Sequence, residues 1–176
     1  MATRLLQIVD SEESQLEDEI AQLYEATFEG LFRYAMAIVR EKEMAEDAIQ
    51  ECFLRYFIAR KEEQAILNAR AWLYRVLRNQ LLDYRKKASL KDVSIDAAAN
   101  YPDRGQSPEA EMRRAELSKG FLALLTAREL ECFKLRIEGL HYQEIAAVLK
   151  IRSGTVGVML GRALKKIQKA MDREGN

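Results

Sequence analysis

The chain has 176 residues, a length that allows one domain or two small ones, and 48% of them are hydrophobic, which is enough for a buried core in each. Its 28 Lys and Arg balance 28 Asp and Glu, so the net charge of zero argues against a uniformly basic nucleic-acid binder. No stretch of the sequence approaches the length that spans a bilayer. We therefore expect a cytoplasmic protein without membrane insertion.

Residues that favour helices dominate the composition. Only two prolines and eight glycines stand among many Ala, Leu, Glu, Lys and Arg residues, whose side chains lose little rotamer freedom in a helix. The predicted fold class is therefore all-α.

Charge is distributed unevenly along the chain. Residues 1–30 hold one Arg and eight acids, whereas residues 70–91 hold seven bases and one acid, and residues 150–173 hold the same numbers. Two basic segments balanced by an acidic N-terminus predict a protein that meets DNA at two places.

The N-terminal half begins with a helical period over residues 17–40, which predicts one long helix or two helices broken at Gly30. A second helix is predicted from about Met44 to Arg60. Its apolar face comprises Ala45, Ile49, Cys52, Phe53 and Tyr56. The opposite face comprises Asp47, Gln50, Glu51 and Leu54.

Residues 61–68 are charged and show little periodicity, so they are predicted to form a loop before a third helix over about 69–87. The inward stripe of this helix comprises Leu73, Val76, Leu77, Leu81 and Tyr84. Trp72, Arg75, Asn79 and Lys86 fall on its outer face, which places the tryptophan on the basic side.

Residues 88–110 contain both prolines and almost no large apolar side chain, which predicts an inter-domain linker. A helix is expected over 111–125, and Thr126, with Glu129 three residues later, is expected to cap another that runs through Gly139. Two shorter helices are predicted to close the chain.

The closing segment has the pattern of a helix-turn-helix. Residues 142–149 place Ile145, Ala146 and Leu149 inward, residues 150–153 form the turn, and a second helix resumes at Gly154 with an inward face. Ser153 is placed to accept a hydrogen bond from a free N–H of that helix. The outward stripe comprises Thr155, Val158, Arg162, Lys165 and Lys169. This polarity suits docking in the major groove, although an ordinary helical hairpin with a solvated basic face has the same pattern.

Cys52 and Cys132 lie far apart between apolar residues, without the spacing of a zinc site, and are predicted to be buried free thiols. With one histidine, no phosphate-binding glycine loop and no nucleophile motif, we expect no enzyme activity, metal or cofactor.

Two stretches resemble a known family. Residues 125–129, 142–146, 154–156 and 162–163 resemble region four of bacterial sigma factors and also the output domain of LuxR-type response regulators. Residues 45–53 and 72–79, with Asp83, are similar to sigma region two, and no receiver-domain pattern appears. The pair resembles the extracytoplasmic-function type of the sigma-70 family. It implies an acidic extension over 1–16, region two over 17–88, a linker over 89–110 and region four over 111–176.

The resemblance implies a sigma factor that binds core RNA polymerase, at the β′ clamp helices and the β flap, and directs it to promoter DNA. An anti-sigma factor is a further partner that it allows. For polymerase binding the family uses the face that here holds Asp47, Gln50, Glu51 and Leu54, although a solvated helix face would look alike.

For capture of the opened minus-ten strand, the resemblance implies stacking surfaces and cations. The residues that could supply them are Trp72, Arg75, Arg78, Asn79, Arg85 and Lys86. Trp72 has the alternative of being a core residue.

For the minus-thirty-five duplex, the resemblance implies the second helix of the helix-turn-helix. The residues implied are Arg152, Ser153, Thr155, Val158, Arg162 and Lys165. Relatives commonly place a Ser and an Arg where this chain has Gly157-Val158-Met159, so fewer polar groups are available to read base edges. His141, where a Ser or Thr usually caps the first helix, is predicted to be a weak cap.

Three functions remain open from the sequence. The first is a sigma factor. The second is a helix-turn-helix regulator that binds duplex DNA without replacing sigma, as a LuxR-like or dimeric protein. The third is a protein-only adaptor whose basic helices serve an acidic partner.

Overall fold

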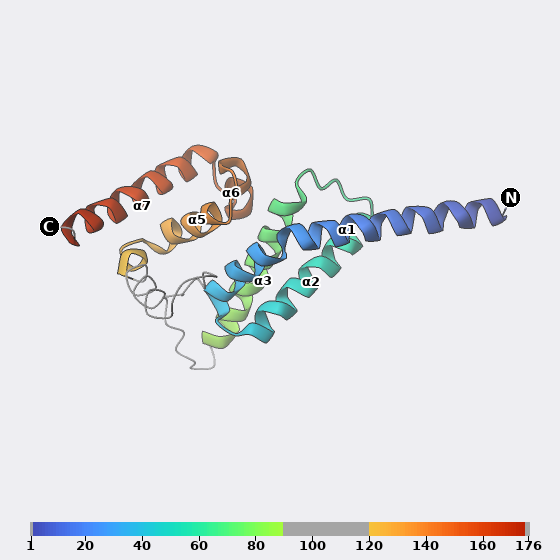
Figure 1. Cartoon of the computed structure of the whole chain (residues 1–176), viewed down its shortest axis with the longest axis horizontal. Coiled ribbons are helices and arrows are strands. Elements are labelled where there is room, and N and C mark those ends of the chain that lie inside the picture. The colour runs from blue at the N-terminus through green and yellow to red at the C-terminus, as the bar shows by residue number, and fades with distance from the viewer. Residues whose placement is uncertain (1, 90–119, 175–176) are drawn as a thin grey trace.

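The computed structural model describes the backbone of residues 2–89 and 120–174, and side chains from 14 to 87 and from 120 to 173 (Figure 1). Within these ranges the regular elements are helices, which confirms the all-α prediction. The helices form two units that match the two predicted domains (Figure 1). From residue 90 on, the predicted linker lies outside the described residues, as does most of the helix expected over 111–125.

The first unit is a bundle of α1 (Ala2–Val39), α2 (Lys42–Lys61) and α3 (Ala69–Ser89), in which each helix packs against the other two. The N-terminal part of α1 projects beyond the bundle (Figure 1). The loop predicted over 61–68 is present, between Lys61 and Ala69. All five residues of the predicted apolar face of α2 are buried, so the helical period was read in the correct register.

Helix α1 runs unbroken through Gly30, which resolves the choice between one helix and two. A Cβ atom at Gly30 would lie 2.6 Å from Tyr74 Oη and 3.1 Å from Glu138 Oε2. The glycine therefore does not break the helix. It lets a buried tyrosine of α3 and an acid from the C-terminal unit approach the α1 backbone closely.

The second unit comprises α5 (Ala127–Ile137), α6 (Tyr142–Leu149) and α7 (Ser153–Glu174). The predicted capping box is confirmed: Thr126 Oγ1 accepts from the Glu129 N–H, and the Glu129 carboxylate accepts from the Thr126 N–H. Gly139 has φ +83°, and its N–H donates to the Arg136 carbonyl, so the glycine ends α5 in the left-handed conformation that favours this residue.

The helix-turn-helix prediction is confirmed in the bounds of α6 and in most of its inward residues. Ile145, Ala146, Val156, Leu160 and Ala163 are buried, and the turn is closed by Lys150 in the left-handed region, after which the Ile151 N–H donates to the Ala146 carbonyl. Two details were wrong. The last helix is not short but spans 22 residues, and it begins at Ser153 rather than after it.

The core is continuous between the two units. One cluster of buried apolar side chains includes Leu31, Tyr34 and Leu77 of the bundle together with Leu135 and Ile145 of the C-terminal unit. Cys52 and Cys132 are fully buried and free, as predicted, and burial raises the pKa of their thiols to about 12 and about 11. The shared cluster shows that the C-terminal unit packs on the N-terminal bundle.

The capping box of α5 gives a pH-dependent prediction. The Lys166 ammonium, 2.6 Å from Glu129 Oε2, and the hydrogen bonds from Thr126 lower the pKa of Glu129 to about 2 from its usual 4.5. A carboxylate with a lowered pKa stabilises the fold above pH 4.5 and loses this contribution as the pH falls towards 2. Glu129→Gln should therefore flatten the loss of thermal stability below pH 4.5, and Thr126→Ala should cost about 1 kcal/mol at neutral pH.

Thermal melts of the full chain at several pH values check this, with Glu46→Gln as the control, because Glu46 makes an exposed i,i+4 pair with Lys42 on α2. An acid-unfolding profile of Glu129→Gln identical to that of wild type would contradict the role of this carboxylate.

Candidate DNA and polymerase interfaces

The predicted polymerase face of α2 lies opposite its buried face. Asp47, Gln50 and Leu54 are exposed, and Leu54 shows 53% of its surface to solvent although it is a large apolar residue. Glu51 is half-buried and accepts from Arg55 at 2.8 Å. The result is one exposed leucine among charged and amide groups, which is the composition of a protein-binding patch with a polar rim.

A cleft of about 400 Å³ joins this face of α2 to α3. Its lining comprises Asp47, Glu51, Arg55, Asn79, Gln80, Asp83, Tyr84 and Lys87. Asn79, one of the predicted minus-ten residues, therefore lies on the same hollow as Asp47. The two functional surfaces predicted for region two are neighbours.

Trp72 does not lie freely on the outer face of α3, where the helical period had placed it. The side chain is half-buried against the core, and its ring meets the buried ring of Tyr56 edge to face, with centroids 5.6 Å apart and an interplanar angle of 66°. Tyr56 in turn donates to Glu19. The tryptophan thus has a packing role on one side and an exposed remainder on the other.

The other predicted minus-ten residues divide into two groups. Asn79, Arg85 and Lys86 are exposed, and Arg75 is half-buried. Arg78 is engaged: its Nε lies 2.6 Å from Glu131 Oε1 and its Nη2 lies 3.0 Å from Glu131 Oε2, a bidentate ion pair with α5. Sequence reasoning missed this pairing because the two residues are 53 positions apart.

The predicted minus-thirty-five residues gather at the N-terminal end of α7. Arg152, Ser153, Thr155, Val158 and Arg162, with Gly154, line one open hollow, and all of them are exposed. Lys165 is exposed one turn further on. The segment thus presents an open, shallow surface of basic and methyl groups, formed by the turn and α7.

The three residues that depart from relatives do not share one environment. A Cβ at Gly157 would lie 3.6 Å from Tyr142 Cε2, and Met159 Sδ lies 3.9 Å from Cys132 Sγ, so both face the protein. Only Val158 of the three is exposed. The loss of polar readout therefore concentrates at one position, Val158.

The cap of α6 is weak, as predicted, because the His141 side chain makes no cap hydrogen bond. His141 occupies the N-cap, and its backbone N–H donates to Glu144 Oε2 at 2.6 Å. Burial raises the pKa of Glu144, but hydrogen bonds from the His141 N–H and the Asn68 amide outweigh it and lower the pKa. The acid, rather than the imidazole, gives this helix start its charge complementarity.

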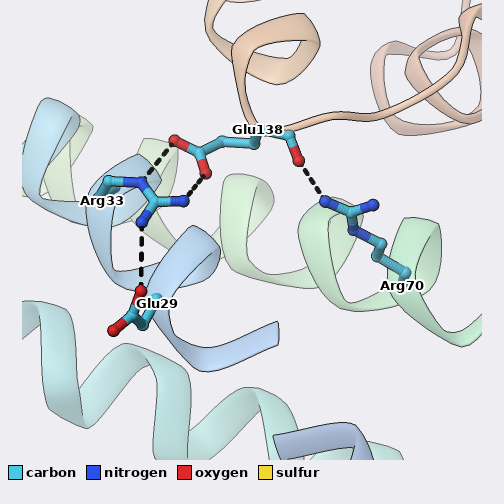
Figure 2. Close-up of polar contacts among 4 residues, drawn as sticks. All are labelled: Glu29, Arg33, Arg70 and Glu138. Carbon is cyan, nitrogen blue, oxygen red and sulfur yellow. Dashed lines mark hydrogen bonds and ion pairs between the residues drawn. The ribbon is translucent and has the colours of Figure 1, made fainter. Parts of the chain in front are cut away.

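Polar residues between the two units had no predicted role. Arg33 and Arg70 of the first unit contact Glu138 of the second, as Figure 2 shows. Lys134 of the second unit donates to the Ala37 carbonyl of the first. Lys134 and Glu138 are both buried in the structure. Nothing in the sequence indicated their partners.

Two sequence models match the chain in the order of these surfaces. Sigma-70 region 2 matches residues 23–90, and Sigma-70 region 4 matches residues 121–167. The chain is a sigma factor of the sigma-70 family, of the extracytoplasmic-function type. The rival reading as a LuxR-type regulator is not favoured, because the region 2 match covers the first unit.

This sigma factor resembles relatives over nearly its full length. It is 26% identical over 163 residues to the ECF RNA polymerase sigma factor SigM of Bacillus subtilis, covering 90% of this chain and 97% of that one. It is 28% identical over 161 residues to the ECF RNA polymerase sigma factor SigL of Mycobacterium tuberculosis, covering 87% and 89%.

Solved structures share its fold. The sigma factor RpoE in complex with the anti-sigma factor NepR, from Bartonella quintana, aligns with a TM-score of 0.68 at 22% identity, covering 88% of this sigma factor and 97% of that chain. CnrH in complex with the cytosolic domain of CnrY aligns with a TM-score of 0.61 at 22% identity, covering 89% and 90%. Among the described residues of this sigma factor, no helix combines the length and apolar character needed to cross a bilayer.

Proposed function

We propose that this sigma factor holds core RNA polymerase with the exposed face of α2, captures the minus-ten strand with α3, and reads the minus-thirty-five duplex with α7. The observation that carries the proposal is the exposed hollow at the start of α7, which the turn and one helix face line with the predicted residues Arg152, Ser153, Thr155, Val158 and Arg162. Cations and methyl groups side by side on an exposed helix start are what docking in the major groove requires.

The α7 surface divides by chemistry. Thr155 and Val158 offer methyl groups at the N-terminal end, where the helix would meet the thymine methyls of base pairs. Arg162 and Lys165 follow on the same exposed face, where their charges would lie nearer phosphates. The arrangement supports a tolerant reader of the minus-thirty-five element, so promoter choice leans on the minus-ten interaction.

We further propose that the protein works in the cytoplasm, has no catalytic activity of its own, and is open to control by an anti-sigma factor. The domain boundaries that go with this proposal are region two over 17–88 and region four over 111–176. The region 2 match, over 23–90, ends two residues beyond the first limit, and the region 4 match, over 121–167, lies inside the second. Both matches support these boundaries.

In vitro transcription with core RNA polymerase on a library of genomic fragments tests the proposed function. We expect specific transcripts only when this sigma factor is added. Tight, sequence-specific binding of duplex DNA by the purified chain, with no polymerase-dependent transcript, would instead support a regulator that does not replace sigma.

The recognition helix gives a prediction that separates phosphate from base contacts. Arg162→Ala should weaken holoenzyme binding to all promoters alike and reduce the salt dependence by about one unit of slope, as a lost phosphate contact does. Val158→Arg should instead change which minus-thirty-five sequences are preferred, because a new bidentate contact discriminates between bases by about 1 to 3 kcal/mol.

Transcription from a promoter library randomised at the minus-thirty-five element measures both effects, with Lys150→Ala as a control for a turn charge outside the hollow. A sharp wild-type preference for guanine that Arg162→Ala removes and Val158→Arg leaves intact would make Arg162 the base reader.

A further inference from the structure

An open groove of about 370 Å³ lies between α1 and the C-terminal half of α2. Its apolar lining comprises Ile20 and Tyr24 of α1 with Phe53 and Phe57 of α2. The Tyr24 ring meets the Phe53 ring edge to face, with centroids 5.0 Å apart and an interplanar angle of 60°, yet 38% of the tyrosine surface is exposed. The fold therefore holds the rings in place while the groove stays open to apolar side chains from outside.

The rim of this groove is acidic. Glu17 and Glu25 line it from α1, and both are exposed. From residue 14 to residue 30, α1 carries five acids and no base. The Lys61 ammonium lies 5.2 Å from the centroid of the Phe57 ring, so a cation already lies against the aromatic lining. The chemistry of the groove suits a segment that combines large apolar side chains with positive charge.

The C-terminal half of α7 has the complementary character. Leu164 and Met171 are each 57% exposed, although both are large apolar residues. Seven positions separate them, close to two helical turns, so they share one face of the helix and form an apolar stripe about 10 Å long. Residues 161–173 hold five bases and one acid. The stripe is distinct from the candidate DNA surface, because Leu164 and Arg162 lie about 160° apart around the helix.

The groove and the stripe belong to opposite ends of the molecule. The N-terminal part of α1 projects at one end, and α7 ends at the other (Figure 1). Helix α7 is fixed within its own unit by the buried Ala163 and by the Lys166 ammonium, 2.6 Å from Glu129 Oε2. In this arrangement the groove of one copy lies within reach of the α7 of another copy rather than of its own.

Pairing of these two unlike surfaces has a consequence for the assembly. When α7 of one copy occupies the groove of a second copy, the first copy still has an open groove and the second still has an exposed stripe. A heterologous contact of this kind continues head to tail unless its rotation closes a ring. The assembly should therefore grow with protein concentration.

We propose that this sigma factor associates head to tail with further copies of itself, with the apolar stripe of α7 seated in the acidic, aromatic groove between α1 and α2. Leu164 and Met171 bury against the aromatic rings, for which a thioether is a favourable neighbour, and the lysines of α7 reach Glu17 and Glu25 on their flexible stems. None of the groove and stripe residues belongs to the sets assigned to DNA or to polymerase.

Sedimentation velocity of the full chain over a range of concentrations tests the head-to-tail contact. The groove variant combines Glu17→Lys and Glu25→Lys, and the stripe variant combines Leu164→Gln and Met171→Gln. All four side chains are exposed, so the substitutions should leave the fold intact, which thermal melts check.

Each variant has a matched control. Glu41→Lys with Glu43→Lys makes the same change of charge at the N-terminal end of α2, whereas the groove is lined by the C-terminal half of that helix. Ile137→Gln replaces another large apolar side chain, 52% exposed at the end of α5. Both controls should associate as wild type does.

Interfaces of standard size have affinities from micromolar to picomolar, so one helix in a short groove should bind more weakly than about 1 μM. The average mass of wild type should therefore rise about twofold or more as the concentration increases from about 1 μM to about 1 mM. Both variants should stay monomeric over the same range. An equimolar mixture of the two variants should form a complex of two chains and nothing larger, because the mixture has one intact groove and one intact stripe for each pair.

Wild type that stays monomeric over the whole range would overturn the proposal. So would association of either variant as strong as that of wild type, or a mixture of the two variants that forms no complex. If wild type stays monomeric and the stripe variant binds core polymerase more weakly than wild type does, the stripe is a polymerase surface instead.

Discussion

Asp47→Arg is expected to reduce the affinity of this sigma factor for core RNA polymerase by about 100-fold or more, while its thermal stability stays close to wild type. Asp47 is exposed on α2, opposite the buried face, so a substitution there should change the free energy of unfolding by less than about 0.5 kcal/mol. A reversed charge within an interface places like charges together, which costs several kcal/mol.

Leu54 gives a second and independent measure of the same face. Its side chain is 53% exposed and is surrounded by the polar groups of Asp47, Gln50 and Glu51. Burial of an exposed leucine side chain by a partner contributes about 1.5 to 3 kcal/mol, so Leu54→Ala should cost about 2 kcal/mol of binding energy, or roughly 30-fold in affinity.

Fluorescence anisotropy titrations with core polymerase measure both effects. Glu62→Arg is the matched control, because Glu62 is exposed at the C-cap of the same helix, outside the face. If Asp47→Arg and Leu54→Ala fold and bind core as wild type does, polymerase must bind elsewhere on region two.

Local signals predicted much of the helical structure of this protein, although α1 begins at Ala2 rather than at residue 17 and α7 is longer than predicted. The capping box at Thr126, the buried face of α2 and the boundaries of α6 all depend on residues within one or two helical turns of each other, and periodicity or cap chemistry carries that information. The continuous α1 was less certain, because Gly30 acts through Tyr74 and Glu138, which are 44 and 108 positions away.

The packing of region four on region two could not be predicted in the same way. Glu131 and Glu138 look like ordinary helix-surface acids until Arg78 and Arg33 are placed opposite them, and the sequence separations are 53 and 105 residues. The predicted linker indicates only that the two domains can change position relative to each other. Which faces meet depends on complementary charges that a single sequence does not pair.

Trp72 shows a further limit of the helical period. The period placed it outward with Arg75 and Asn79, whereas its ring packs edge to face on Tyr56 at the edge of the core. An indole is large enough to reach sideways from a boundary position, so one residue can serve both packing and stacking. The alternative of a core residue and the role in strand capture are therefore compatible.

Trp72→Ala is accordingly expected to have two effects that can be separated. Loss of the ring from beside Tyr56 should lower the free energy of unfolding by about 3 kcal/mol, at the low end for a truncated aromatic because the side chain is only half-buried. Loss of the exposed part of the indole should also weaken open-complex formation, since stacking of one base on an aromatic ring contributes about 1 to 3 kcal/mol.

Trp72→Phe distinguishes the two roles, because a phenyl ring can keep the edge-to-face contact with Tyr56 while presenting a smaller surface to a base. We expect Trp72→Phe to retain most of the thermal stability and core binding but to show reduced permanganate reactivity of minus-ten thymines on a mapped promoter. Tyr56→Phe serves as the control on the other side of the contact: it keeps the ring pair and removes only the hydroxyl that donates to Glu19, so strand opening should be unchanged. If Trp72→Phe opens the promoter as wild type does, and Trp72→Ala fails only in proportion to its unfolded fraction, then the ring is a packing residue and strand capture belongs to Arg75, Asn79 and the basic end of α3.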